Sequence, residues 1–177
     1  LIGAVVVPVD ENLPATQFKK IVEESSARIT ILENLNMAEN FTKNFTFKEI
    51  SKNLSKEYQI QNYPRLDDKA DLLFTSGTTG SPKGVILTHD NIFSGAVNIN
   101  KFIGNKSSDV ELLPLPLNHS FGLARLRCNM LKGASIQITK GFLIPGKIFR
   151  LIDERKITGL STVPAGIAVL FKFGGDK

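Results

Sequence analysis

The chain has 177 residues, 42% hydrophobic and 22% charged, which suits one globular domain, or parts of two, with a sizeable buried core. Its net charge of +5 comes with acidic residues interspersed among the basic ones, as at Lys19, Lys20, Glu23 and Glu24, a mixture typical of solvated helix faces. No apolar run approaches the roughly 18 residues of a membrane-spanning helix, so we expect a soluble protein with no transmembrane segment and no nucleic-acid partner.

The first part of the chain is predicted to alternate strands and helices. Residues 2–9 are an apolar run that indicates a buried strand, ended by turn-forming residues at 10–12. A helix is expected from about Pro14, because proline suits a first helical turn, and 28–32 is expected to be the next strand. The Asn- and Lys-rich stretch 33–69 predicts a surface excursion with a short helix near 47–54, and it leaves open that the partner of strand 28–32 lies outside this sequence.

From residue 71 the pattern of elements is clearer. In chain order we expect strand 71–75, a glycine-rich loop at 76–84, strand 85–87, a helix capped by Thr88 with Ile92, Phe93, Ala96 and Val97 on its apolar face, strand 110–117, helix 121–132 ended by Gly133, strand 135–139, helix 145–155, strand 157–163 and a helix from 164. Strands separated by helices of this length imply βαβ units. The predicted fold class is therefore α/β, with parallel sheets and flanking helices.

The single cysteine, Cys128, cannot form an internal disulfide, which is consistent with a reducing compartment and a cytoplasmic location. It lies among Leu123, Leu126 and Leu131 in an expected helix, so we predict a buried, unreactive thiol. The chain starts at Leu1, inside an apolar run. From this start we expect an internal piece of a longer protein.

The segment 72–84, Leu-Leu-Phe-Thr-Ser-Gly-Thr-Thr-Gly-Ser-Pro-Lys-Gly, carries most of the functional information. Three glycines permit backbone angles that turn several N–H groups toward one point. Lys83 adds a flexible positive charge. The hydroxyl residues that can also donate to phosphate oxygens are Thr75, Ser76, Thr78, Thr79 and Ser81. These groups favour a triphosphate-binding loop over a Ser/Thr/Gly-rich surface turn. The common nucleotide-triphosphatase loop does not fit. In that loop the lysine follows the last glycine and precedes a hydroxyl residue, whereas here Lys83 precedes Gly84 and no hydroxyl residue follows directly.

Residues 75–91, Thr-Ser-Gly-Thr-Thr-Gly-Ser-Pro-Lys-Gly-Val-Ile-Leu-Thr-His-Asp-Asn, closely resemble the signature loop of adenylate-forming enzymes. That family includes acyl- and aryl-CoA synthetases, nonribosomal peptide adenylation domains and luciferases. Two other segments are similar to family motifs in the right order. Residues 3–10 resemble the Gly-Ala…Val-Pro-(Leu/Ile)-Asp strand, and 115–123 resemble the Pro-Leu-x-His-x-x-Gly segment.

The resemblance implies an AMP-forming acid–thiol ligase. Such enzymes use ATP and Mg²⁺ to convert a carboxylic acid into an acyl-adenylate, release pyrophosphate and pass the acyl group to coenzyme A or to the pantetheine of an acyl carrier protein. The residues expected to bind the β- and γ-phosphates are Thr75, Ser76, Gly77, Thr78, Thr79, Gly80 and Lys83. His119 is expected beside the reacting carboxylate, with Phe121 and Gly122 shaping that wall. A loop histidine satisfied by backbone groups is the alternative.

Several family segments are not found in this sequence. They are the Tyr-Gly-x-Thr-Glu segment whose glutamate helps to hold Mg²⁺, the ribose-binding aspartate, the hinge and the C-terminal lysine. No metal ligand is therefore expected within the chain, and the chain alone is expected to be inactive. The fold implied is part of the large N-terminal domain, with 1–95 ending one α/β subdomain, 96–177 starting the next, and the boundary between Ile86 and Lys106. Unpaired strand edges in such a piece predict self-association.

Two other functions remain open at this point. A phosphotransferase with the same loop would produce ADP instead of AMP, and a non-catalytic nucleotide-binding module would turn over no substrate. The apolar residues Leu115, Leu117 and Phe121 favour a hydrophobic carboxylate, as in fatty acid metabolism, over an amino acid.

Overall fold

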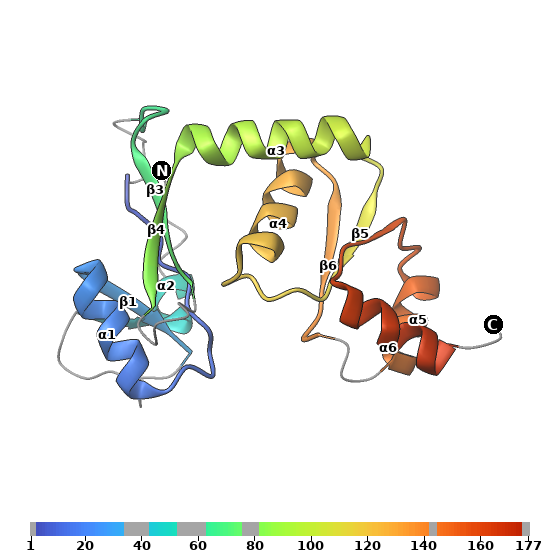
Figure 1. The fold of residues 1–177 in the computed structure, drawn as a ribbon, viewed down its shortest axis with the longest axis horizontal. Coiled ribbons are helices and arrows are strands. Elements are labelled where there is room, and N and C mark those ends of the chain that lie inside the picture. Colours follow the sequence, from blue (N-terminus) through green and yellow to red (C-terminus); the bar gives the residue numbers. More distant parts are fainter. Residues whose placement is uncertain (1–2, 34–42, 53–62, 76–81, 142–144, 175–177) are drawn as a thin grey trace. The chain divides into compact units, whose positions relative to one another are not determined.

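Helices and strands alternate along the residues that the computed structural model describes, which are 3–33, 43–52, 63–75, 82–141 and 145–174 (Figure 1). The chain divides into two units, Leu1–His89 and Asp90–Lys177, and each is described here by itself. This division falls at the start of helix α3, His89–Ile103, whereas the subdomain boundary at 95/96 expected from the sequence lies inside that helix. The assignment of the two parts to family subdomains stays a prediction.

The first unit starts with a helix whose beginning was expected from Pro14. Helix α1 spans Ala15–Ser25 with Pro14 at its N-cap, and it ends where Ser26 adopts a left-handed backbone with φ of 52°. Ile21 and Val22 are its buried residues, so this helix packs through the face that its apolar spacing indicates.

The strand that follows α1 finds its partner inside the Asn-rich excursion. β1 (Ile29–Leu32) pairs in parallel with β2 (Lys43–Thr46), and α2 (Phe47–Lys52) follows directly. Thr46 and Glu49 form a capping box at this helix start, with the Thr46 amide donating to Glu49 Oε2 over 2.7 Å and the Glu49 amide donating to Thr46 Oγ1 over 3.2 Å. The short helix is thus confirmed. The alternative left open by the sequence, that the partner of this strand lies outside it, is thus excluded for the β1–β2 pair.

Residues 3–9 are not the buried strand that their composition predicts. Val5 and Val6 are 42% and 56% exposed, and the segment makes one isolated parallel bridge, from Val6 to Asp71. Two main-chain hydrogen bonds of 2.9 Å hold this bridge, one from the Val6 amide to Ala70 O and one from the Leu72 amide to Val6 O. Apolar composition alone did not distinguish a strand with partners on both sides from an edge segment.

The first unit ends in an antiparallel pair, β3 (Lys69–Thr75) and β4 (Lys83–Thr88). Sequence spacing predicted both strands. The hairpin connection differs from the βαβ arrangement expected for the chain as a whole, because the intervening residues 76–82 join two neighbouring antiparallel strands.

The second unit is built on a parallel sheet with strand order β6-β5-β7. Its elements are α3 (His89–Ile103), β5 (Val110–Leu113), α4 (Ser120–Lys132), β6 (Ser135–Ile138), α5 (Pro145–Glu154), β7 (Gly159–Leu160) and α6 (Pro164–Gly174). Central strand β5 carries the fully buried Leu112 and Leu113. Helix α4 lies against β5 and β6, and α5 lies beside α6 (Figure 1). A parallel sheet with flanking helices confirms the α/β fold class.

Two strands of this unit are shorter than predicted. β5 ends at Leu113, because Pro114 has no N–H to continue the ladder, whereas 110–117 was expected. β7 covers Gly159–Leu160 within the expected 157–163. Gly133 ends α4 as predicted, with a left-handed φ of 67°. Among the helices of the described residues, none is long and apolar enough to cross a membrane.

Candidate functional site

The predicted phosphate loop is closed at its base by the β3–β4 hairpin. Thr75 and Lys83 are the last cross-strand pair, and the Thr75 hydroxyl donates to Lys83 O over 3.4 Å. Both residues are exposed. The other predicted phosphate ligands, namely Ser76, Gly77, Thr78, Thr79 and Gly80, lie outside the described residues. The structure thus brings together the two described members of the set, and the phosphate-binding role of the whole set stays a prediction.

The hairpin is held by an asymmetric pattern of burial. In β3, Ala70, Asp71 and Leu73 are buried, whereas β4 is exposed from Lys83 to Ile86. Strand β3 therefore anchors the hairpin and β4 covers its outer edge.

Gly84 does not have the position or the backbone conformation expected of a loop glycine. It lies within β4 opposite Phe74 and is not among the described glycines with positive φ. A Cβ built on it would approach Leu72 Cδ1 to 2.8 Å. Its missing side chain therefore makes room for a neighbouring leucine on the sheet. The expectation that Gly84 turns backbone amides toward phosphate is corrected.

The predicted acyl-site residues form the start of helix α4 in the second unit. His119 is the N-cap, with an extended backbone at φ of −100° and ψ of 145°, and Phe121 is 43% exposed in the first turn. The Leu123 amide donates to His119 O over 3.0 Å, and the His119 amide donates to Pro116 O over 3.3 Å. The His119 imidazole makes no capping hydrogen bond to the described main chain of the helix.

Gly122 is buried where α4 comes closest to the segment after β5. A Cβ built at Gly122 would collide with the carbonyl oxygen of Pro116 and stand 3.0 Å from its carbonyl carbon. No side chain fits there without moving main chain. Leu115, expected on the acyl wall, is buried at 9% exposure and packs under this contact, and the exposed residues of the turn are His119, Ser120 and Phe121.

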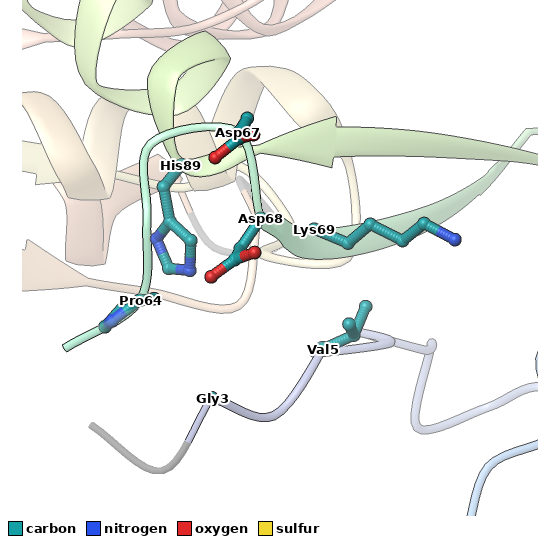
Figure 2. Close-up of a pocket in the computed structure, with 7 residues that line it drawn as sticks. All are labelled: Gly3, Val5, Pro64, Asp67, Asp68, Lys69 and His89. Carbon is teal, nitrogen blue, oxygen red and sulfur yellow. The ribbon is translucent and has the colours of Figure 1, made fainter. Parts of the chain in front are cut away.

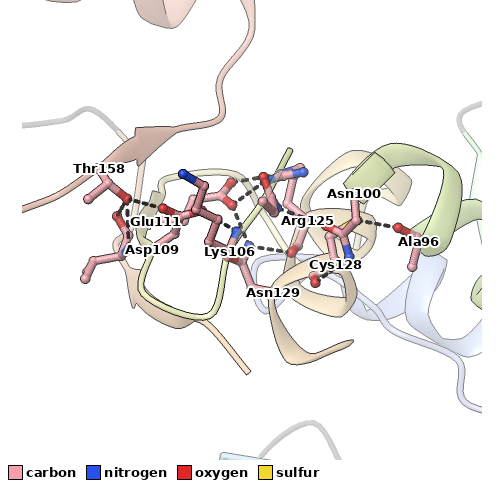
Figure 3. A network of polar contacts seen from close by, with 11 residues as sticks. Ala96, Asn100, Lys106, Asp109, Glu111, Arg125, Cys128, Asn129 and Thr158 are labelled. Carbon is pink, nitrogen blue, oxygen red and sulfur yellow. Dashed lines mark hydrogen bonds and ion pairs between the residues drawn. The ribbon is translucent and has the colours of Figure 1, made fainter. Parts of the chain in front are cut away.

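Behind this turn lies a polar network that the sequence did not predict (Figure 3). Glu111 of β5 and Arg125 of α4 form a buried ion pair, and the Asn129 amide donates to the same carboxylate. Burial by itself raises the pKa of Glu111, but hydrogen bonds from Arg125, Ser161 and Asn129 outweigh it, so the pKa lies below its ordinary value. The signal in the sequence was a glutamate within the apolar run 110–113.

Cys128 is fully buried, as the sequence predicted. Burial raises the pKa of its thiol, and the nearby Arg125 guanidinium only partly offsets this effect. The Sγ atom lies 3.9 Å from Ala96 O on α3. A protonated, enclosed thiol of this kind is structural.

A shallow, open pocket of about 480 Å³ lies in the first unit, at the end of the hairpin opposite the loop (Figure 2). Its lining residues are Gly3, Val5, Pro64, Asp67, Asp68, Lys69 and His89. The His89 amide donates to Asp68 O over 3.1 Å, which ties the start of α3 to the start of β3. Within the part of the chain that the structure describes, no group of three or more His, Cys, Asp or Glu side chains could hold a metal ion.

The profile of the family described as "AMP-binding enzyme" matches residues 1–177, the whole chain. This match, over a chain with an α/β fold, identifies the chain as a member of the AMP-binding enzyme family. The resemblance to adenylate-forming enzymes that the three sequence motifs indicate is thereby confirmed.

Individual relatives agree with this assignment. The 2-succinylbenzoate–CoA ligase of Geobacillus sp. (strain WCH70) is 29% identical over 99% of this chain. The o-succinylbenzoate CoA synthetase of Bacillus subtilis, solved with its acyl-adenylate intermediate, aligns over 93% of this chain with a TM-score of 0.84 and 26% identity. The same enzyme solved with ATP and magnesium ion aligns over 91% with a TM-score of 0.82 and 27% identity. The chain spans 36% of the Geobacillus ligase and 44% and 34% of the two solved chains.

Proposed function

We propose that this chain supplies the phosphate-binding loop and part of the acyl site of an AMP-forming acid–thiol ligase. In that reaction a carboxylate attacks the α-phosphate of ATP, an acyl-adenylate forms and pyrophosphate leaves. A thiol then takes the acyl group and AMP is released. The observation that carries the proposal is the match of the AMP-binding enzyme profile over all 177 residues.

In this proposal the loop on the β3–β4 hairpin binds the β- and γ-phosphates. Its described ends suit an anion, because the exposed Lys83 ammonium offers three donors, and the Thr75 hydroxyl adds a fourth when it turns away from Lys83 O. Ser76, Gly77, Thr78, Thr79 and Gly80 complete the proposed set. Their work is to orient the polyphosphate and to stabilise the charge that develops on the leaving pyrophosphate. The described residues contain no carboxylate cluster for Mg²⁺, so we assign its ligand to residues other than these.

The acid is proposed to bind against the first turn of α4. His119 and Phe121 are exposed there and offer one hydrogen-bonding ring and one apolar ring, which suits a hydrophobic or aromatic carboxylate. Coenzyme A is the proposed acceptor, and transfer to a carrier-protein pantetheine is the alternative outcome of an acceptor assay. Because a relative is named as a 2-succinylbenzoate–CoA ligase, 2-succinylbenzoate is a first substrate to test. Fatty acids are tested beside it, because the apolar residues of the segment favour a hydrophobic acid.

The proposal also covers the cellular location and the self-association of the chain. We place the activity in the cytoplasm, in line with the single buried thiol. We also propose that the isolated chain self-associates, because β1 and β2 expose the apolar side chains of Ile29, Ile31 and Phe45. Sedimentation of the chain over a range of concentrations measures this association.

Acid-dependent exchange of radioactive pyrophosphate into ATP tests the proposed function in the protein that contains this chain. We expect exchange with at least one acid of a panel of 2-succinylbenzoate, benzoates and fatty acids, and AMP as the product once coenzyme A is added. Formation of ADP would instead favour the phosphotransferase. Nucleotide binding without any turnover would favour the non-catalytic module.

A further inference from the structure

A buried ion pair joins the central strand of the second unit to the helix that carries His119. Arg125 Nε donates to Glu111 Oε1 over 2.9 Å and Arg125 Nη2 donates to Glu111 Oε2 over 2.5 Å. The two side chains are 6% and 4% exposed. Figure 3 shows the guanidinium and the carboxylate facing each other between α4 and β5. Two parallel bonds of this kind define both the distance and the rotation between the groups.

Further donors complete the surroundings of the Glu111 carboxylate. Asn129 Nδ2 donates to Glu111 Oε2 over 2.5 Å and to Arg125 O over 2.8 Å. On the other side of α4, Asn100 Nδ2 of α3 donates to Cys128 O over 2.9 Å. Helix α4 is therefore held by directional bonds to elements on two sides.

Stability alone does not account for this pair. Bringing two charges out of water has a large desolvation cost, and apolar residues of similar volume are often as stable in such a place. A bidentate pair gives defined geometry, which apolar contacts do not impose, because they tolerate small shifts and rotations. The arrangement is therefore suited to holding α4 at a set position on the sheet.

The position of α4 determines where His119 lies. Gly122 and Arg125, three residues apart, share the buried face of α4, and His119 is the exposed N-cap at the start of the same helix. Gly122 makes the tight approach to Pro116, and Arg125 makes the ion pair one turn further on. The imidazole has no capping bond to the described helix start, so its placement depends on where α4 sits.

We propose that Arg125 and Glu111 are positioning residues for the reaction, because their ion pair sets the first turn of α4 so that His119 and Phe121 meet the acid substrate. This inference rests on the proposed function. It predicts effects on kcat and on KM for the acid and none on KM for ATP, because Thr75 and Lys83, the described phosphate-binding candidates, belong to the hairpin of the first unit.

Three variants separate geometry from stability. Arg125→Lys keeps the charge but removes the planar fork. Arg125→Met leaves the Glu111 carboxylate buried without its main partner. The double variant Glu111→Leu/Arg125→Met removes both charges and restores an apolar contact, and Asn129 retains its bond to the main-chain carbonyl at position 125. Arg65→Lys and Arg65→Met are the matched controls, since Arg65 pairs with Asp67 at 80% and 74% side-chain exposure.

The experiment measures pyrophosphate exchange, with kcat and KM determined separately for acid and ATP, alongside Tm, in the protein that contains this chain. We expect Arg125→Lys and the double variant to lower kcat/KM for the acid by about 10- to 100-fold, with KM for ATP unchanged. The double variant should keep a Tm close to that of the wild type. Recovery of normal acid kinetics in the double variant would show a purely structural role and overturn the proposal.

A second readout keeps the inference separate from the proposed function. The NMR signal of the His119 imidazole, assigned by its loss in His119→Gln, should shift in all three variants and stay in place in the Arg65 controls. If the wild type activates no acid, the proposed function fails while this signal still reports on positioning. An unchanged His119 signal in Arg125→Lys and in the double variant would refute the inference whatever the activity.

Discussion

Thr75 and Lys83 are paired across the last step of the β3–β4 hairpin, and the Thr75 hydroxyl donates to the Lys83 main-chain carbonyl over 3.4 Å. The ladder and this bond use main-chain atoms of Lys83, so the base of the loop does not depend on the lysine side chain. The exposed ammonium is left available for a ligand. Lys83 can therefore be replaced with little effect on the hairpin itself.

Replacing Lys83 by alanine should slow adenylate formation about 10²- to 10³-fold in the protein that contains this chain, because one preorganised charge on the leaving pyrophosphate is lost. The measurement is the rate of pyrophosphate exchange, with a thermal unfolding curve to check the fold. Lys69→Ala is the matched control, since Lys69 is an exposed lysine at the other end of the same hairpin, where it follows Asp68 and pairs with Thr88. Equal rates for the two variants would contradict the role given to Lys83.

Gly122→Ala should destabilise the second unit by about 1–3 kcal/mol, because the added methyl meets main-chain atoms of Pro116 that cannot rotate away. Urea unfolding measures this loss. Gly95→Ala in α3 provides the control, as nothing lies within 4 Å of a Cβ built there. That control should be neutral or stabilising by about 0.5–1 kcal/mol. A Gly122→Ala variant as stable as the wild type would mean that α4 is not in close contact with Pro116.

The Cys128 thiol should resist alkylation in the folded protein even at pH about 8, because burial both encloses the sulfur and raises its pKa. Incubation with iodoacetamide followed by peptide mass mapping measures the modified fraction. The same reaction in concentrated urea, where the thiol regains an ordinary pKa, supplies the positive control. Rapid modification of Cys128 in the native protein would be inconsistent with a fully buried side chain.

The Glu111–Arg125 pair should make stability depend on acid pH. The pKa of Glu111 is below its ordinary value of 4.5 in the folded state, so its carboxylate contributes stability above pH 4.5. That contribution should decline as the pH falls below 4.5 toward the folded pKa, where the carboxyl takes up a proton. Urea unfolding of the wild type and of Glu111→Leu/Arg125→Met over this range measures the difference. Parallel curves for the two proteins would rule out the linkage.

Local signals predicted much of the fold. Pro14 and Gly133 each mark a helix end through their own backbone preferences. Helix α1 begins within a residue of Pro14, and α4 begins and ends within a residue of the predicted 121–132. The pairing of strands was harder to predict. β2 was not expected, and the apolar run at 3–9 proved to be an exposed edge, because pairing depends on segments far away in the sequence.

Some residues of the candidate site could likewise be predicted from a local motif, and others could not. His119, Phe121 and Gly122 were found from one contiguous motif, and the structure places all three at the start of α4. Glu111 and Arg125 belong to no motif, and a charged residue in isolation is more typical of an exposed face. Only the packing of α4 on β5 shows that the two charges are buried against each other.

The amino-acid order by itself determined the family and the local elements, since a signature loop, a proline or a glycine acts through neighbouring residues of the same chain. The tertiary structure alone decided which strand pairs with which, that Gly84 makes room for Leu72, and that Glu111 meets Arg125. The contact between Glu111 and Arg125, for example, forms in the unit that buries Leu112 and Leu113. Such burial is a property of the whole folded unit, and no short stretch of residues specifies it.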